Sequence, residues 1–91
     1  MLYTKDAIKD FTTLSLEKKQ SKVKAIATKL ADSYPFYAEV LALFDRFGSK
    51  VSENILDYVY EVTMKLVDVN QKHEILGDEM EKLQELKKTI R

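Results

Sequence analysis

Hydrophobic residues recur at intervals of three and four along most of the chain, the spacing that places them on one face of an α-helix. Alternating runs of Val, Ile and Thr are missing, and no Asn-Gly or Asp-Gly pair marks a hairpin turn. The pattern therefore predicts an all-α protein. We expect four main helices and a short helix near residues 4–11, arranged as a small antiparallel bundle because short connections place consecutive helices side by side.

Capping residues indicate where the first two helices begin. Thr4 can cap the short first helix, and Ser15 can cap the second. The second helix is amphipathic, with an apolar stripe expected in the core and lysines expected mostly on the opposite, solvated side. As an alternative, the lysines form a surface for an anionic membrane or partner. The stripe consists of Leu16, Val23, Ile26, Ala27, Leu30 and Ala31, and the lysines are Lys18, Lys19, Lys22, Lys24 and Lys29.

The third helix is the most apolar segment of the chain. Pro35, the only proline, suits its first turn and moves Tyr34 out of helical geometry. Gly48 supplies a stop, and Ser49 or Ser52 begins the next helix. Because apolar residues lie on most of its sides, we expect this helix to be the central element of the core. These residues are Phe36, Tyr37, Val40, Leu41, Leu43, Phe44 and Phe47.

A seam of heptad-like spacing runs from Ile55 to Ile90, and it leaves two interpretations open. A continuous helix over residues 52–90 would be about 58 Å long and would need a partner, which favours a C-terminal coiled coil. Against it, Gly77 weakens a helix interior and can act as the stop of a helix, and Asp78 with Glu81 resembles the cap of a new helix. We favour a break within residues 71–78, which makes the C-terminal half a helix hairpin.

Composition indicates one globular domain over residues 1–91. The chain is 45% hydrophobic and 33% charged, which suffices for one small core. It has no cysteine, which excludes disulfides and thiolate metal sites. No apolar run approaches the roughly 18 residues of a transmembrane helix, and the first residues lack the apolar region of a signal peptide. These features predict a cytoplasmic protein.

The net charge is zero, from 15 basic and 15 acidic residues, which argues against nucleic-acid binding. The charges are unevenly placed, because residues 1–33 carry an excess of lysine and residues 51–76 an excess of acid. We expect these two segments to face each other, or alternatively to form docking faces. Glu53, Asp57 and Glu61 lie one helical turn apart and predict a solvated acidic stripe, or an edge that binds a basic peptide.

The sequence contains no residue pattern typical of catalysis, metal binding or phosphate binding. His73 has no Glu-x-x-His pair or cysteine beside it to hold a metal, and Gly48 and Gly77 are too isolated for a phosphate loop. We therefore expect no enzyme, no metal and no cofactor, and a function through contact with a protein. Tyr58 is expected at the core edge and Tyr60 exposed, where tyrosines make good interface anchors.

Three stretches of the chain, "AEVLALFDRF", "VSENILDYVYEVTMKL" and "LGDEMEKLQELKKTI", resemble the class IIa (pediocin-like) bacteriocin immunity proteins. The resemblance covers roughly residues 15–90 and is mostly an amphipathic pattern. In particular, "ILDYVY" is similar to the start of the family's third helix, and "LGDEMEKLQEL" to the turn and opening of its last helix.

This resemblance implies a cytosolic antiparallel four-helix bundle that protects its producer. It would lock a complex of the bacteriocin with its mannose-transporter receptor, so the partner would be a membrane transporter complex. The C-terminal helix would carry specificity, with Leu83 and Leu86 packing and with Lys87, Lys88 and Arg91 exposed.

Two other functions remain open. A dimeric coiled-coil adaptor or a small regulatory, phage-type protein would be built on the long helix 52–90 as a homodimer. A nucleic-acid regulator would use the basic helix 15–33, but the zero net charge and the lack of a recognisable helix-turn-helix argue against it.

Overall fold

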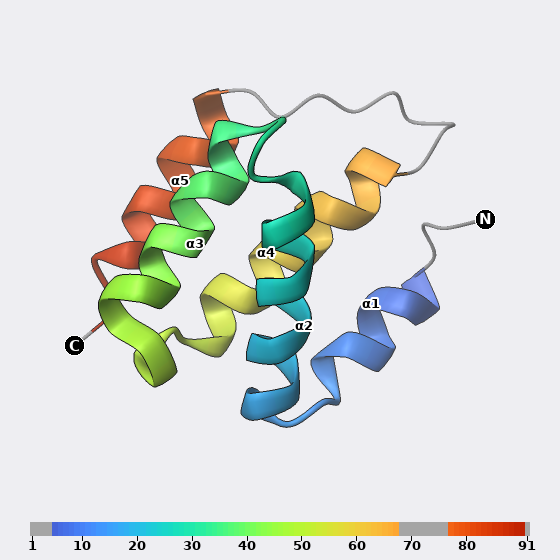
Figure 1. The fold of residues 1–91 in the computed structure, drawn as a ribbon. Helices are drawn as coiled ribbons and strands as arrows, with labels where there is room; N and C mark the ends of the chain where they lie inside the picture. Colours follow the sequence, from blue (N-terminus) through green and yellow to red (C-terminus); the bar gives the residue numbers. More distant parts are fainter. Residues whose placement is uncertain (1–4, 68–76, 91) are drawn as a thin grey trace.

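Five α-helices form a small all-α bundle in the computed structural model, which describes residues 5–67 and 77–90 (Figure 1). In Figure 1, α2 and α3 run in opposite directions, α4 crosses obliquely behind α2, and α5 lies beside α3 and runs the same way. The predicted fold class is confirmed. The elements are α1 (Lys5–Thr12), α2 (Leu16–Leu30), α3 (Pro35–Phe47), the 3-10 turn η1 (Gly48–Lys50), α4 (Glu53–Val67) and α5 (Gly77–Lys87).

The ends of α2 and α3 lie where the local signals predict. Ser15 is extended (φ −65°, ψ 159°), and its hydroxyl accepts a hydrogen bond of 3.4 Å from the backbone N–H of Lys18. Pro35 is the first residue of α3, and Tyr34 before it is extended. Gly48 ends α3 with φ 55°, a conformation that favours glycine.

The continuous helix over residues 52–90 is not formed, because α4 and α5 are separate helices that pack against each other. Of the two serines proposed to begin α4, Ser52 does so, since its carbonyl accepts the N–H of Leu56 at 3.1 Å. Gly77 is the first residue of α5 rather than the stop of the helix before it, so Asp78 lies inside α5. Thr4, His73 and most of the predicted break lie outside the described residues.

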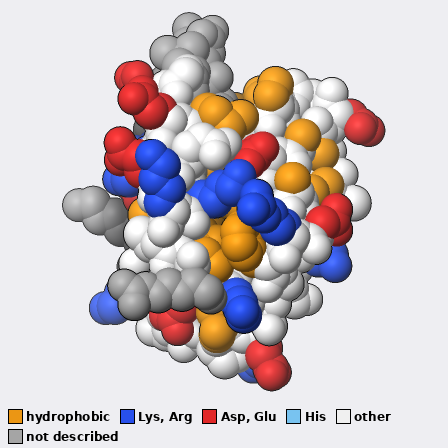
Figure 2. Space-filling model, turned by 90° about the vertical axis from the view of Figure 1, so that its left-hand side faces the viewer, with side chains coloured by type: hydrophobic (Ala, Val, Ile, Leu, Met, Phe, Trp, Pro, Cys, Tyr) orange, Lys and Arg blue, Asp and Glu red, His pale blue; other side chains and the backbone are white. Residues whose placement is uncertain are grey.

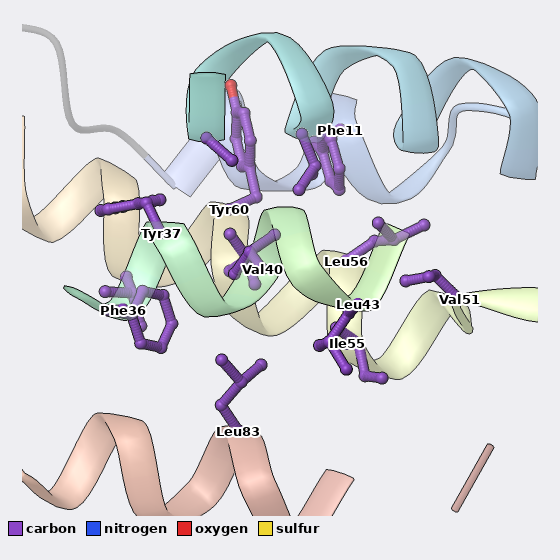
Figure 3. Close-up of a cluster of buried hydrophobic side chains, with 14 residues drawn as sticks. Phe11, Phe36, Tyr37, Val40, Leu43, Val51, Ile55, Leu56, Tyr60 and Leu83 are labelled. Atoms are coloured by element: carbon purple, nitrogen blue, oxygen red, sulfur yellow. The ribbon is translucent and has the colours of Figure 1, made fainter. Parts of the chain in front are cut away.

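The core is built mainly from α3 and α4: α3 supplies four buried hydrophobic side chains, and α4 supplies five and packs against α1, α2 and α5. The prediction that α3 would be the central element is confirmed only in part, because α3 shares the core with α4 (Figure 3). The buried hydrophobic residues are Phe11, Val23, Ala27, Phe36, Tyr37, Val40, Leu43, Val51, Ile55, Leu56, Val59, Tyr60, Val62 and Leu83.

The apolar stripe of α2 reaches this core except at its first residue. Val23 and Ala27 are fully buried, and three further members of the stripe are partly buried against them. Leu16 is 37% exposed, contrary to the prediction. As the first residue of α2 it lies at the end of the helix, where the neighbouring helices cover it less.

A buried pair of hydroxyl groups joins α3 to α4. The oxygens of Tyr37 and Thr63 are 2.8 Å apart, and the Thr63 hydroxyl donates to the carbonyl of Val59, also at 2.8 Å. A threonine hydroxyl has one hydrogen, so Tyr37 must be the donor to Thr63. Both buried groups are thereby satisfied, and burial raises the pKa of Tyr37 to about 12.

We expect this tyrosine to make the fold sensitive to alkali. The unfolded chain loses the tyrosine proton near the ordinary pKa of about 10, whereas the folded protein keeps it up to a pH of about 12. The free energy of unfolding therefore falls as the pH rises from about 10 to about 12. The loss amounts to roughly 3 kcal/mol at ~1.4 kcal/mol per pH unit. The difference between the wild type and Tyr37→Phe in urea unfolding between pH 8 and 12 measures it. Tyr37→Phe should cost about 1 kcal/mol at neutral pH and weaken the alkaline loss; an unchanged alkaline loss would contradict the assignment.

Candidate functional site

A shallow hollow of about 300 Å³ lies where α4 packs against α5, and we call it the α4–α5 hollow. It contains a tyrosine and charged groups of both signs, a composition that suits polar contact with a macromolecule better than enclosure of an apolar ligand. Its walls are formed by Tyr58, Glu61, Val62 and Lys65 of α4 and by Asp78, Glu79 and Lys82 of α5.

Tyr58 is the aromatic residue of the α4–α5 hollow, and it lies half-buried at the core edge, as predicted. The Tyr58 ring meets the edge of Phe36, and the Nζ of Lys82 lies 4.9 Å from the ring centroid, within the range of a cation–π contact. Burial raises the pKa of Tyr58 to about 12, with smaller effects of Glu79 and then Glu61. The hydroxyl therefore stays protonated at neutral pH.

On the α4 side of the α4–α5 hollow, the ion pair between the charged groups is weak. Lys65 Nζ lies 3.5 Å from Glu61 Oε1, one helical turn away, and both side chains are more than a third exposed. Such a pair contributes only about 0.3–0.5 kcal/mol. On the α5 side, Asp78 and Glu79 lie in the first helical turn, where the helix dipole favours acids. A partner can therefore re-pair the Lys65 and Glu61 charges at little cost.

Tyr60, predicted to be exposed, is buried and does not belong to this site. Its ring stacks on Phe11 of α1 with the centroids 4.0 Å apart, and the Nζ of Lys22 lies 5.5 Å from its centroid. The prediction treated α4 as packed along one face only, whereas α1 covers a second face. Tyr58 and Tyr60 thus point to different sides of α4.

The end of α5 meets the predictions only in part. Lys87, predicted to be exposed, is partly buried and pairs with Glu39 of α3 at 3.5 Å, because α5 lies alongside α3. Lys88 is exposed as expected, and Arg91 lies outside the described residues. The face formed by α3 and α5 mixes hydrophobic side chains with Lys, Arg and acidic groups (Figure 2). Neither Lys87 nor Lys88 lines the α4–α5 hollow.

Leu83 and Leu86 pack as the resemblance implies, since Leu83 is fully buried and Leu86 is partly buried against the core. Sequence reasoning missed Lys82, which completes the site around Tyr58. The two residues are far apart in the sequence and meet only because α5 docks on α4, so no local pattern marks the contact.

A buried ion cluster joins α2 to α4 away from the α4–α5 hollow. Lys19 is 1% exposed, and its Nζ lies 3.2 Å from Glu53 Oε2 and 3.0 Å from Asp57 Oδ1. Burial lowers the pKa of Lys19, but hydrogen bonds and charge from Asp57 and Glu53 outweigh it, so the pKa is raised. This cluster confirms that the basic and acidic segments face each other.

Lys19 itself was wrongly placed on the solvated side of the second helix. It lies four residues before Val23 and eight before Ala27, so all three share one face of α2. Glu53 and Asp57 of the predicted acidic stripe are accordingly ion-paired, rather than only solvated.

Comparisons with known proteins add no relatives: no family model, no curated protein and no solved structure matches this chain. Among the described residues, no three side chains of His, Cys, Asp or Glu are grouped to hold a metal ion. None of the helices in the same part of the chain combines the length and apolar character needed to cross a membrane.

Proposed function

We propose that this protein acts by binding another protein through the α4–α5 hollow, without catalysing a reaction. The observation that carries the proposal is the position of Tyr58, a half-exposed ring held by Phe36 and Lys82 at the edge of a hollow with charges of both signs. Tyrosine rings are common anchors of interfaces, and surrounding charges orient the partner and speed its encounter.

The attachment of α5 supports this proposal. Leu83 is fully buried, further apolar residues of α5 are partly buried against the core, and an ion pair joins Lys87 to Glu39, so α5 is held to the bundle. Exposed charged residues such as Glu81, Lys82 and Glu85 remain on its outer side. A charged helix on a packed scaffold presents side chains in a fixed arrangement, which favours recognition of one partner over others.

The most specific form of the proposal is a cytoplasmic immunity protein of the class IIa type. Its support is the resemblance of the segment "LGDEMEKLQELKKTI", nearly all of which lies in or next to the surface helix α5. The partner would then be a membrane transporter complex that has bound the bacteriocin, and the α4–α5 hollow would contact it from the cytoplasmic side.

Expression in a strain sensitive to pediocin-like bacteriocins tests this form. We expect the wild-type chain to preserve growth against at least one member of a panel of such peptides. The double variant Tyr58→Ala with Lys82→Glu should lose this protection, because it removes the anchor and reverses the adjacent charge. Lys29→Glu, an equally large charge change on the exposed side of α2, is the matched control and should retain protection.

Two results would count against the proposal. Failure of the folded wild-type chain to protect against any peptide of the panel would remove the immunity function. Protection that survives Tyr58→Ala with Lys82→Glu as well as Lys29→Glu would place the contact elsewhere on the protein. Circular dichroism of each variant separates loss of contact from loss of fold.

A further inference from the structure

We propose that α1 exchanges between two copies of this chain, so that the groove between α2 and α4 takes α1 from a partner copy. The dimer would be closed and two-fold symmetric, with each copy donating Phe11 to the other. This inference concerns a different surface from the α4–α5 hollow and does not depend on the proposed function.

Phe11 docks α1 between α4 and the first turns of α2. Phe11 is fully buried there, its ring stacks on Tyr60 of α4, and the Nζ of Lys19 of α2 lies 5.7 Å from its centroid. Figure 3 shows the Phe11 and Tyr60 side chains next to each other beneath α2. Among residues 8–12 of α1, Ile8 is half-buried and only Phe11 is fully buried. Among these described residues Phe11 is the main anchor of α1, and the same anchor from another copy fits the same groove.

The connection between α1 and α2 is short and compatible with a helix. Three residues separate Thr12 from Leu16, and residues 5–30 contain neither glycine nor proline. The turn is held by the N–H of Leu14 donating to the carbonyl of Phe11 at 3.0 Å, and by the long Ser15 cap of 3.4 Å. Thr13 adds its N–H and its hydroxyl, which both donate to the carbonyl of Asp10, at 3.3 and 2.7 Å. Ordinary helical hydrogen bonds can replace the backbone bonds and the cap, giving one helix about 39 Å long over residues 5–30.

Straightening this turn moves α1 out of its own groove. In Figure 1, α1 folds back from the lower end of α2, so a joined helix would carry α1 beyond that end, towards a second copy. The contacts of Phe11 with Tyr60 are lost in one copy and regained in the other. Because the exchanged contacts are identical, the dimer requires no new interface chemistry, and short connections are known to favour such exchange.

The exchange gives a dimer with two copies of the α4–α5 hollow. It involves α1, α2 and one side of α4, whereas Lys82 and the other α5 residues of the α4–α5 hollow take no part. The dimer therefore presents two copies of that hollow, which strengthens binding to any partner that is itself clustered.

Sedimentation equilibrium of the full chain over a range of concentrations tests the proposal, with Leu16→Pro as the blocking variant. Proline is accepted at the first residue of a helix, Leu16 is exposed, and Ser15 already has the extended conformation that a following proline requires. The same proline breaks a joined helix. We expect the wild type to form dimers at high concentration and Leu16→Pro to stay at 10.6 kDa.

A second variant favours the exchange. Thr13→Ala with Ser15→Ala removes the cap and raises the helix propensity of the connection, so it should tighten the dimer at least about tenfold. Wild type and this variant both remaining monomeric at millimolar concentration would overturn the proposal. Equal dimerisation of wild type and Leu16→Pro would overturn it too, because the dimer would then not need the joined helix.

Discussion

Removing the two carboxylates that face Lys19, by Glu53→Ala with Asp57→Ala, is expected to lower the free energy of unfolding by about 2–4 kcal/mol. The double variant leaves a buried ammonium group with no charge partner, and such losses are among the largest effects of single interactions. We place the effect slightly below the usual range for buried pairs because Glu53 and Asp57 are 57% and 36% exposed, so water can replace them in part. Denaturation in urea at pH 7 measures the change.

The converse substitution should be milder. Lys19→Met keeps the volume and apolar contacts of the side chain but leaves the buried Asp57 Oδ1 without its ion-pair partner, so we expect a loss of about 1–2 kcal/mol. Glu61→Ala, which removes an exposed pair with Lys65 on the same helix, is the matched control and should change stability by less than about 0.5 kcal/mol. Equal losses for Lys19→Met and the double variant would show that packing, not charge pairing, dominates this cluster.

Leu83→Ala is expected to destabilise α5 by about 2–5 kcal/mol. Leu83 is the fully buried side chain of this helix and points from α5 into the core towards α3 and α4 (Figure 3). Truncation removes its apolar contacts and leaves a cavity where they were. Because the rest of α5 is partly or fully exposed, we expect the helix to open locally before the other helices unfold.

Amide hydrogen exchange measures this local opening helix by helix. In Leu83→Ala the amides of α5 should lose protection strongly, and those of α2 and α4 much less. Glu85→Ala on the exposed side of the same helix is the control and should leave the exchange pattern unchanged. A uniform loss of protection over all helices would instead mean that α5 unfolds only together with the whole bundle.

Leu83→Ala and the double variant Glu53→Ala with Asp57→Ala also act on different proposed sites, the α4–α5 hollow and the groove of α1. Loss of α5 dismantles the α4–α5 hollow, since Asp78, Glu79 and Lys82 come from that helix. The Lys19 cluster lies beside Phe11 in the groove of α1, so its loss affects the proposed exchange rather than the hollow. The candidate site was only half predictable: Tyr58 follows from the seam of α4, whereas Lys82 depends on how α5 docks.

The sequence alone determined the helices and most of their ends, because these depend on groups a few residues apart. Helical spacing predicts all-α structure, and Ser15, Pro35 and Gly48 act through neighbouring backbone groups. Only the tertiary structure decided that α4 shares the core with α3, that Lys19 and Tyr60 are buried, and that Lys87 pairs with Glu39. Those outcomes depend on which helices cross, and a helix covered on a second face buries residues that its own periodicity assigns to solvent.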